Sequence, residues 1–285
     1  MRIISIRKAI QKSLLPSGET VFAVDAYDGC EIACPYCYQW EDPSWSRVVA
    51  VKTNIADALS KEVEQLPQHS IVYLGDRSDP YMLMEKRFQL TRRILQVLCL
   101  SRVETVLISK SHNGTIMRDI DIFREFGERL TICIGLSHLV PNRHRVASRL
   151  RDMARIANRL KADGLRTVAF LAPFLPGITE IEEVLLALDE TTPLAVDGLW
   201  VNKGGRAAAR TLSYVRAWWP ELMPMYEGIM ENGPESQMSR LRQQYRGNHR
   251  VGFLRSAIGG ETRVLSGLIP QAEKQPHKKG QWREG

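Results

Sequence analysis

The sequence predicts an α/β protein, a partial (β/α)6 TIM barrel with a mostly helical C-terminal extension. Three observations lead to this fold class. Short apolar runs alternate with amphipathic runs, which is the pattern of βα units around a parallel sheet. Polar and glycine-rich stretches follow the apolar runs, where parallel barrels gather their functional groups. The chain has 285 residues with 44% hydrophobic content, enough to bury one large core.

The first strand is expected at 21–25, a short apolar run that leads into a cysteine-containing loop. Further runs of this kind predict strands at 71–75, 105–109, 130–136, 167–172 and 196–201. The amphipathic stretches between them predict helices at 55–65, 90–100, 118–126, 148–163 and 181–189, with a last one near 207–218. Six βα repeats are fewer than the eight of a closed TIM barrel, so an open six-stranded barrel is expected.

The chain divides into three regions. Residues 1–202 are predicted to form the barrel core, 203–270 an extension that completes or caps the barrel, and 271–285 a polar, lysine-rich, disordered tail. In the extension, aromatic residues are interleaved with Arg240, Arg242, Arg246, Arg250 and Arg255, a composition that can hold phosphates and stack bases. The favoured alternative is a helical cap with Leu241 and Tyr245 on its inner face and with Trp218 buried.

The formal net charge is +7 and the isoelectric point is near 9.2. This charge permits an anionic partner such as a nucleic acid, although many proteins carry similar charge as a solvated face. No apolar run is long enough to cross a bilayer, and the N-terminus lacks a signal-type apolar stretch. We therefore expect a soluble, cytoplasmic protein with no membrane partner.

Cys30, Cys34 and Cys37 are the most informative residues of the chain. Three thiolates on one short loop can hold three irons of a [4Fe–4S] cube and leave the fourth iron open to another ligand. A structural zinc site wants four ligands, and no second Cys or His pair lies nearby in the sequence. A disulfide framework does not suit a long chain with five cysteines and no signal peptide. The pattern therefore predicts an iron–sulfur cluster.

The spacing of these cysteines resembles the signature of the radical S-adenosylmethionine (SAM) superfamily. The resemblance implies two cofactors, a [4Fe–4S] cluster and SAM, whose methionine part would chelate the open iron. It also implies a 5′-deoxyadenosyl radical that abstracts hydrogen, and an electron donor such as flavodoxin or ferredoxin. Tyr36 stands just before the third cysteine, where this family has an aromatic residue beside the adenine.

Other segments resemble the spore photoproduct lyase-like branch of that superfamily, over roughly Ile6 to Glu180. The similar segments are the entry Ile6–Trp40, with a short basic helix expected first, then Asp79–Tyr81, Glu85–Lys86, Leu90–Leu95, Ser109–Ser111, Arg118–Asp119 and Ala172–Gly177. After the fourth strand the branch has a Glu-Pro pair, whereas this chain has Pro141–Arg145. The branch implies a lyase that acts on a nucleic acid or nucleotide. A peptide or natural-product intermediate is the alternative substrate, and a redox or binding protein with a cluster but without SAM chemistry is the alternative outside enzymes.

Polar residues at the strand ends are the candidates for binding SAM. Asp76, Ser78 and Asp79 could accept from the ribose hydroxyls or the amino group, while Lys110 and Ser137 could meet the carboxylate and the ribose. Arg149 could pair with the carboxylate through two parallel hydrogen bonds. Each residue could instead serve turn chemistry or face solvent. Cys133, on the fourth strand, is either a hydrogen donor in the barrel or a small core residue, and Cys99 is expected in the core.

Overall fold

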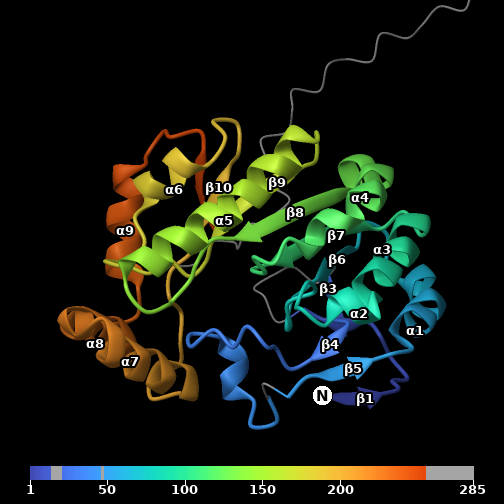
Figure 1. Cartoon of the computed structure of the whole chain (residues 1–285), viewed down its shortest axis with the longest axis horizontal. Helices are drawn as coiled ribbons and strands as arrows, with labels where there is room; N and C mark the ends of the chain where they lie inside the picture. The colour runs from blue at the N-terminus through green and yellow to red at the C-terminus, as the bar shows by residue number, and fades with distance from the viewer. Residues whose placement is uncertain (14–20, 46–47, 255–285) are drawn as a thin grey trace, which may run out of the picture.

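A twisted parallel sheet forms the centre of the computed structural model, which describes residues 1–13, 21–45 and 48–254 (Figure 1). Its strands run in the order β3 (Val21–Val24), β6 (Ile71–Leu74), β7 (Glu104–Ser109), β8 (Leu130–Gly135), β9 (Thr167–Leu171) and β10 (Leu194–Val196). Each neighbouring pair is parallel. Successive βα units thus lie side by side, and the α/β class with an open, partial barrel is confirmed.

The sixth strand differs from the prediction. The range 196–201 is wrong, because β10 ends at Val196. The Asp197 carboxylate accepts from the backbone N–H of Gly198 and from Nε1 of Trp200, both at 2.8 Å, and these bonds turn the chain away from the sheet. Beyond β10 the extension adds β11 (Val251–Phe253), which pairs in parallel with β10. At the other edge, β2 (Gln11–Lys12) pairs antiparallel with β3.

A small second sheet, which the sequence pattern does not reveal, has the order β1 (Arg2–Ile4), β5 (Ala50–Lys52) and β4 (Tyr27–Asp28). β1 precedes the segment from Ile6 onward in which the short basic helix was expected, and that expectation is wrong for 6–13, which hold β2 and no helix. Residues 14–20 lie outside the described part of the chain. β4 ends just before Cys30, and β5 begins where the cysteine loop returns. The antiparallel pairing of β4 with β5 therefore fixes both ends of that loop.

The helices pack around the main sheet. Their bounds are α1 (Ile55–Glu62), α2 (Glu85–Phe88), α3 (Leu90–Leu100), α4 (Ile120–Phe126), α5 (Arg143–Ala162), α6 (Ile181–Ala187), α7 (Arg206–Trp218), α8 (Met223–Asn232) and α9 (Glu235–Gln244). α5 begins five residues before its predicted start, because the Asn142 side chain accepts from the backbone N–H of Arg145 at 3.1 Å and caps the helix. α7 lies beside the segment that follows the cysteine loop, and α8 packs against α7 (Figure 1).

Alternation along the strands divides the core into two layers. Val72, Leu107 and Ile132 belong to the cluster that the helices cover, whereas their neighbours Tyr73 and Cys133 belong to a smaller cluster on the inner face. In the extension, Trp219 is 2% exposed and Trp218 is 52% exposed, so the predicted burial of Trp218 is wrong and belongs to the next residue.

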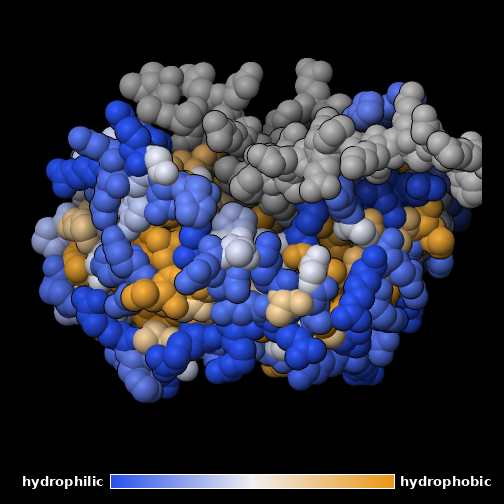
Figure 2. All heavy atoms as spheres, turned by 90° about the horizontal axis from the view of Figure 1, so that it is seen from above, coloured by the Kyte–Doolittle hydropathy of each residue, from blue (hydrophilic) through white to orange (hydrophobic). Residues whose placement is uncertain are grey.

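The part of the chain that the structure describes contains no helix long and apolar enough to span a membrane. Charged and polar side chains dominate the face seen in Figure 2, with smaller apolar areas between them. The predicted tail 271–285, and residues 255–270 of the predicted extension, lie outside the described residues.

Candidate active site

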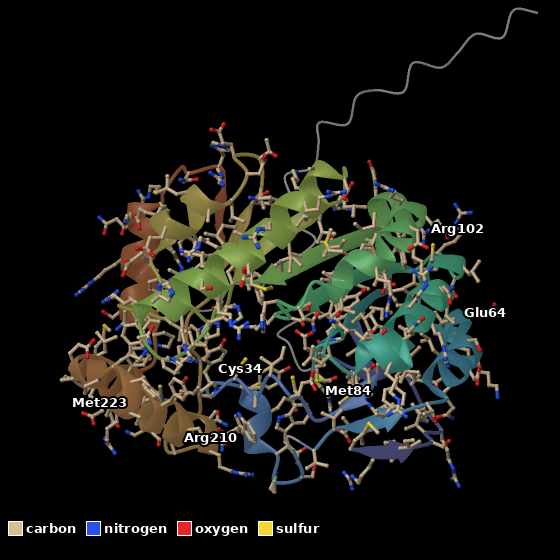
Figure 3. All side chains as sticks on the ribbon, viewed as in Figure 1. Cys34, Glu64, Met84, Arg102, Arg210 and Met223 are labelled. Atoms are coloured by element: carbon tan, nitrogen blue, oxygen red, sulfur yellow. The ribbon has the colours of Figure 1, made fainter. Side chains whose placement is uncertain are left out.

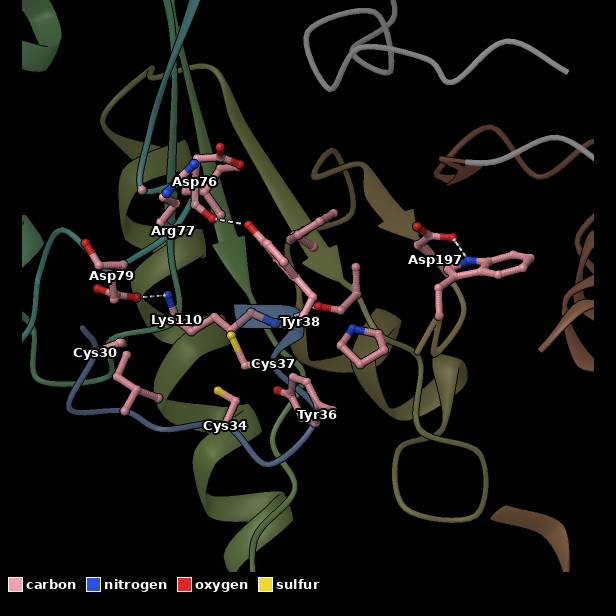
Figure 4. Close-up of a pocket in the computed structure, with 18 of the residues that line it drawn as sticks. Cys30, Cys34, Tyr36, Cys37, Tyr38, Asp76, Arg77, Asp79, Lys110 and Asp197 are labelled. Atoms are coloured by element: carbon pink, nitrogen blue, oxygen red, sulfur yellow. Dashed lines mark hydrogen bonds between the residues drawn. The ribbon is translucent and has the colours of Figure 1, made fainter. Parts of the chain in front are cut away.

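Three cysteines line one cavity at the carboxyl ends of the strands (Figure 4). Cys30, Cys34 and Cys37 form one wall of this cavity, which has a volume of about 240 Å³. Segments that follow β6, β7, β9 and β10 supply the other walls. The inner layer of the core, including Tyr73 and Phe170, closes it below. The exits of β3, β6, β7, β9 and β10 thus meet here, whereas no residue from the exit of β8 lines the cavity. We name this space the interior cavity.

The environment of the thiols suits an iron–sulfur cluster better than a single ion. Burial raises the pKa of Cys30 to about 12 and that of Cys37 to about 11, and it also raises the pKa of Cys34. A cationic metal centre must therefore replace the thiol protons for these residues to act as thiolates. Within the described residues, no group of three His, Cys, Asp or Glu side chains is close enough to hold one metal ion. In a [4Fe–4S] cube three thiolates each bind a different iron, so the three loop cysteines supply the donor set of a cluster with one open iron.

Tyr36 and Lys110 lie beside the thiols. The Tyr36 hydroxyl donates to the carbonyl oxygen of Ser137 at 2.6 Å, and Lys110 Nζ lies 5.2 Å from the centre of the Tyr36 ring. The same ammonium donates to the carbonyl oxygen of Ala172 at 2.6 Å, and burial lowers the pKa of Lys110. Gly135 makes room for the lysine, because a Cβ there would stand 2.5 Å from Lys110 Cγ. The side chain thus crosses from the third strand exit to the fifth, past the cysteines.

Asp79 joins two strand exits. Its carboxylate accepts from Ser109 Oγ at 3.0 Å, from the Tyr81 N–H at 2.9 Å and from the backbone N–H of Lys110. Burial raises the pKa of Asp79 to about 6 despite these bonds. The residue therefore braces the loop after β6 against the end of β7, and it faces the cavity from that position.

Comparisons with known proteins decide the family. The model of the radical SAM superfamily matches residues 24–188, more than half of the chain and including all three loop cysteines. The chain belongs to the radical SAM superfamily. The cofactors of this superfamily are a [4Fe–4S] cluster and SAM, as the resemblance of the cysteine spacing implied.

Two relatives are similar in sequence to this radical SAM chain. One is the uncharacterized protein MJ0683 of Methanocaldococcus jannaschii, 28% identical over 67% of this chain and 72% of its own. Another is the uncharacterized protein Rv2578c of Mycobacterium tuberculosis, 28% identical over 75% of this chain and 68% of its own.

Solved structures of spore photoproduct lyase share the fold. A double mutant with bound AdoMet and dinucleoside spore photoproduct has a TM-score of 0.54, 14% identity, and covers 88% of this chain and 80% of its own. The lyase complexed with dinucleoside spore photoproduct has a TM-score of 0.50 and 14% identity over 76% of this chain and 66% of its own. At this identity the likeness confirms the fold that the resemblance to this branch implied.

Most of the candidate SAM-binding residues line the interior cavity, and the others do not. Asp76, Ser78, Asp79, Lys110 and Tyr36 line the interior cavity together with the cysteines. Ser78 Oγ donates to the carbonyl oxygen of Tyr27 at 3.0 Å, so part of its role is to hold the loop.

Three other candidates lie outside the walls of the interior cavity. Ser137 is fully buried and meets Tyr36 through its carbonyl oxygen. Arg149 lines a second cavity of about 420 Å³, which shares Cys34, Tyr36 and Lys110 with the first. Cys133 is fully buried in the inner core layer, with its pKa raised by burial. Their roles toward SAM or substrate stay predictions.

Several residues that line the interior cavity were not predicted from the sequence. Tyr38 lines the interior cavity and donates through its hydroxyl to the carbonyl oxygen of Asp76 (Figure 4). Asp197 and Trp200 form the opposite wall. The only signal for Tyr38 was its place directly after the third cysteine, and Asp197 and Trp200 were assigned to a strand.

The C-terminal extension also contacts the segment that follows the cysteine loop. The Glu41 carboxylate accepts from the backbone N–H groups of Arg206 and Ala207 at 3.2 and 3.0 Å, at the N-terminus of α7. Gly205 permits this approach, since a Cβ there would stand 2.5 Å from Glu41 Oε1. Arg210 lies over the Trp40 ring, with 3.8 Å from Cζ to the ring centre, and Figure 3 shows it on the side of α7 toward this loop. The segment that continues from Cys37 is thereby fastened to α7.

Proposed function

We propose that this protein is an enzyme that reductively cleaves SAM and uses the resulting 5′-deoxyadenosyl radical to abstract hydrogen from a substrate in the interior cavity. When bound, the cluster supplies the electron that divides the SAM sulfonium into methionine and that radical. The observation that carries the proposal is the convergence of the three loop cysteines with polar side chains from two strand exits on one cavity. A protein that only stored electrons would not need this ring of polar groups beside the thiols.

The residues of the chain would hold SAM as follows. Lys110 Nζ would donate to the methionine carboxylate, because this ammonium lines the cavity together with the cysteines. It has three N–H donors and uses one of them in its bond to the carbonyl oxygen of Ala172. Asp76 and Ser78 would accept from the amino group or the ribose hydroxyls, and the Tyr36 ring would lie beside the adenine. Ser137 would act through its carbonyl, which already orients the Tyr36 hydroxyl.

A nucleotide or nucleic acid is the substrate class that we propose first. Tyr38, Tyr73, Phe170 and Trp200 surround the interior cavity, and aromatic walls suit the planar rings of nucleobases. The dinucleoside bound to the lyase structures of the same fold supports this choice. The basic extension supports it less than the sequence suggested, since Arg242 pairs with Glu235 at 2.6 Å and is largely covered.

Anaerobic reconstitution tests the proposal. We expect about four irons per chain, because three thiolates complete a cube with one open iron, and we expect methionine and 5′-deoxyadenosine on addition of dithionite and SAM. Cys34→Ala should lose both the cluster and the products, whereas Cys99→Ala should keep both. Full SAM cleavage by Cys34→Ala would overturn the assignment. A stable cluster without any SAM cleavage would favour the redox-protein alternative.

Isotope transfer tests the substrate class. Oligonucleotides deuterated in the sugar or base should pass deuterium to 5′-deoxyadenosine if a nucleotide is the hydrogen donor, and binding should weaken with salt. Deuterium transfer from a peptide, with none from DNA or RNA, would select the alternative of peptide or natural-product modification.

A further inference from the structure

Helix α7 carries a row of arginine and aromatic side chains along one side. Its members follow one another at intervals of four residues, which places them above one another on the helix surface: Arg206, Arg210, Tyr214 and Trp218. Tyr214 is half-buried and the other three are exposed. The Tyr214 and Trp218 rings lie 6.5 Å apart, centre to centre. We name this set the α7 row, and at 1.5 Å per residue it extends over about 18 Å.

The start of α5 adds two cations beside the aromatic end of this row. The exposed Arg143 lies over the Trp219 ring, with 5.4 Å from Cζ to the ring centre. Burial raises the pKa of Tyr214, and the exposed Arg145 lies close enough to act in the opposite direction. Positive charge and aromatic rings therefore alternate across the surface formed by α5 and α7.

Carboxylates do not neutralise these cations. The ion pairs on α5 and α7 use a different set of arginines, namely Arg155, Arg159 and Arg216. Within residues 1–13, 21–45 and 48–254, no ion pair involves Arg143, Arg145 or Arg210. The acid at the start of α7, Glu41, already accepts from two backbone N–H groups. The field over this surface is therefore positive, which suits a polyanion, and the rings suit stacking on unpaired bases.

The α7 row begins beside the interior cavity. The segment Tyr38–Glu41 packs against α7, and its first residue lines the cavity on the side of the cysteines. From the opposite wall, the chain leaves Trp200 and enters α7 at Arg206. The row is thus joined to two walls of the cavity.

The next step rests on the proposed function. A cavity of about 240 Å³ that also holds SAM has no room for several nucleotides, so the neighbours of a reacting nucleotide in a strand lie on the surface outside it. We propose that the α7 row, together with Arg143 and Arg145, binds a single-stranded nucleic acid next to the nucleotide in the interior cavity. The guanidinium groups hold phosphates, and Tyr214 and Trp218 stack on unpaired bases.

Fluorescence anisotropy of a labelled oligothymidylate, titrated with the cluster-reconstituted protein at several salt concentrations, tests this surface. Trp218→Leu keeps an apolar side chain but removes the ring, and should weaken binding about tenfold, as expected for the loss of one stacked base. Trp218→Phe keeps a ring and should recover most of the affinity. Arg145→Ala should reduce the slope of log affinity against log salt by about 0.7, the value for one phosphate of a single strand. Arg151→Ala, at an exposed position farther along α5, is the matched control and should keep the wild-type slope.

Three results would overturn the proposal: no binding by the wild type even in low salt, wild-type affinity in Trp218→Leu, or equal slopes in Arg145→Ala and Arg151→Ala. Labelled polyglutamate is the competing probe, and equally tight binding of it with the same loss in Trp218→Leu would assign the surface to an acidic protein instead.

SAM cleavage with dithionite, measured without any nucleic acid, separates this proposal from the proposed function. Trp218→Leu and Arg145→Ala should both cleave SAM within about twofold of the wild-type rate, because neither residue lines the interior cavity. If the wild type binds the strand but cleaves no SAM, the proposed function fails and the binding surface stands. If it cleaves SAM but binds no strand, the surface alone is overturned.

Discussion

The indole N–H of Trp40 donates to the carbonyl oxygen of Cys34 at 2.9 Å. The same carbonyl oxygen accepts the backbone N–H of Cys37 at 3.1 Å, so the spacing between two cluster ligands is fixed by a turn that an aromatic side chain completes. Trp40 itself is 5% exposed and packs with Ala33, Trp45 and Ala207. The geometry of the cysteine loop thus depends on a residue outside the cysteine motif.

Trp40→Phe should weaken cluster retention without unfolding the protein. Phenylalanine keeps the apolar packing and loses the bond to Cys34, a net loss of about 1 kcal/mol, which is roughly a fivefold faster release of iron to a chelator. Trp218→Phe on α7 is the control, because Trp218 is 52% exposed and its ring lies beside Tyr214 of the same helix. Equal iron release from the two variants would contradict the role of the indole N–H.

Replacing Arg118 is expected to lower the free energy of unfolding more than replacing most other partly exposed residues. Arg118 pairs with Glu85 at 2.9 Å and with Asp119 at 2.8 Å, and both carboxylates are fully buried. Tyr27 also donates to Glu85, so the network links the first strand exit to the helices behind it. Arg118→Ala takes the guanidinium away from the buried Glu85 carboxylate, whereas Asp119 keeps its pair with Arg92 at 3.0 Å. The variant should have a free energy of unfolding about 3 kcal/mol lower in urea titrations.

The control for this network is Arg216→Ala. Arg216 lies 3.9 Å from Glu227 in a pair whose side chains are both more than half exposed. Removing it should change the free energy of unfolding by less than about 1 kcal/mol. A similar cost for the two variants would show that the buried network contributes no more than a surface pair.

The adjacent residues Trp218 and Trp219 show where sequence reasoning stopped. The pattern identified an aromatic, amphipathic segment but could not fix which indole faced inward, since α7 ends at Trp218 and the chain turns there. Trp219→Ala should cost about 3–5 kcal/mol as a buried aromatic, and it also removes the Nε1 bond to the carbonyl oxygen of Val140. Trp218→Ala should cost about 1 kcal/mol or less. Thermal and urea unfolding of both variants measure the difference. A larger loss of stability in Trp218→Ala than in Trp219→Ala would support the sequence-based prediction that Trp218 is the buried residue.

Other elements of the fold that the sequence did not predict share one physical cause. The loop cysteines and the first five strands follow from local spacing and apolar runs, which are properties of neighbouring residues. The pairing of β1 with β5, and of β11 with β10, joins segments far apart in the chain and only three residues long. Such strands carry too few residues for a period-two pattern, so tertiary pairing rather than propensity defines them. Tyr38 also depends on a contact between distant segments, since its hydroxyl donates to the carbonyl oxygen of Asp76, 38 residues away.

Asp25 should make the stability of the apoprotein depend on pH. This carboxyl group, at the end of β3, accepts from the N–H groups of Arg77 and Ser78 at 2.9 and 3.0 Å. Burial and the nearby Asp76 nevertheless raise its pKa from 3.8 to about 6, against the lowering effects of the hydrogen bonds and Lys52. Between these two values the folded state binds a proton that the unfolded state has released. Its contribution to stability is therefore present below about pH 4 and is lost as the pH rises through 6.

Asp25→Asn isolates this effect. Asparagine keeps an oxygen to accept from both N–H groups but has no charge to bury. Relative to wild type, the variant should gain on the order of 2–3 kcal/mol in the free energy of unfolding as the pH rises from about 4 to about 7. Urea titrations of the cluster-free proteins across this range measure the difference between them, which cancels the contribution of Asp79. A difference that stays constant with pH would show that Asp25 is ionised in the folded state throughout, stabilised by Lys52 and the two N–H groups more strongly than burial destabilises it.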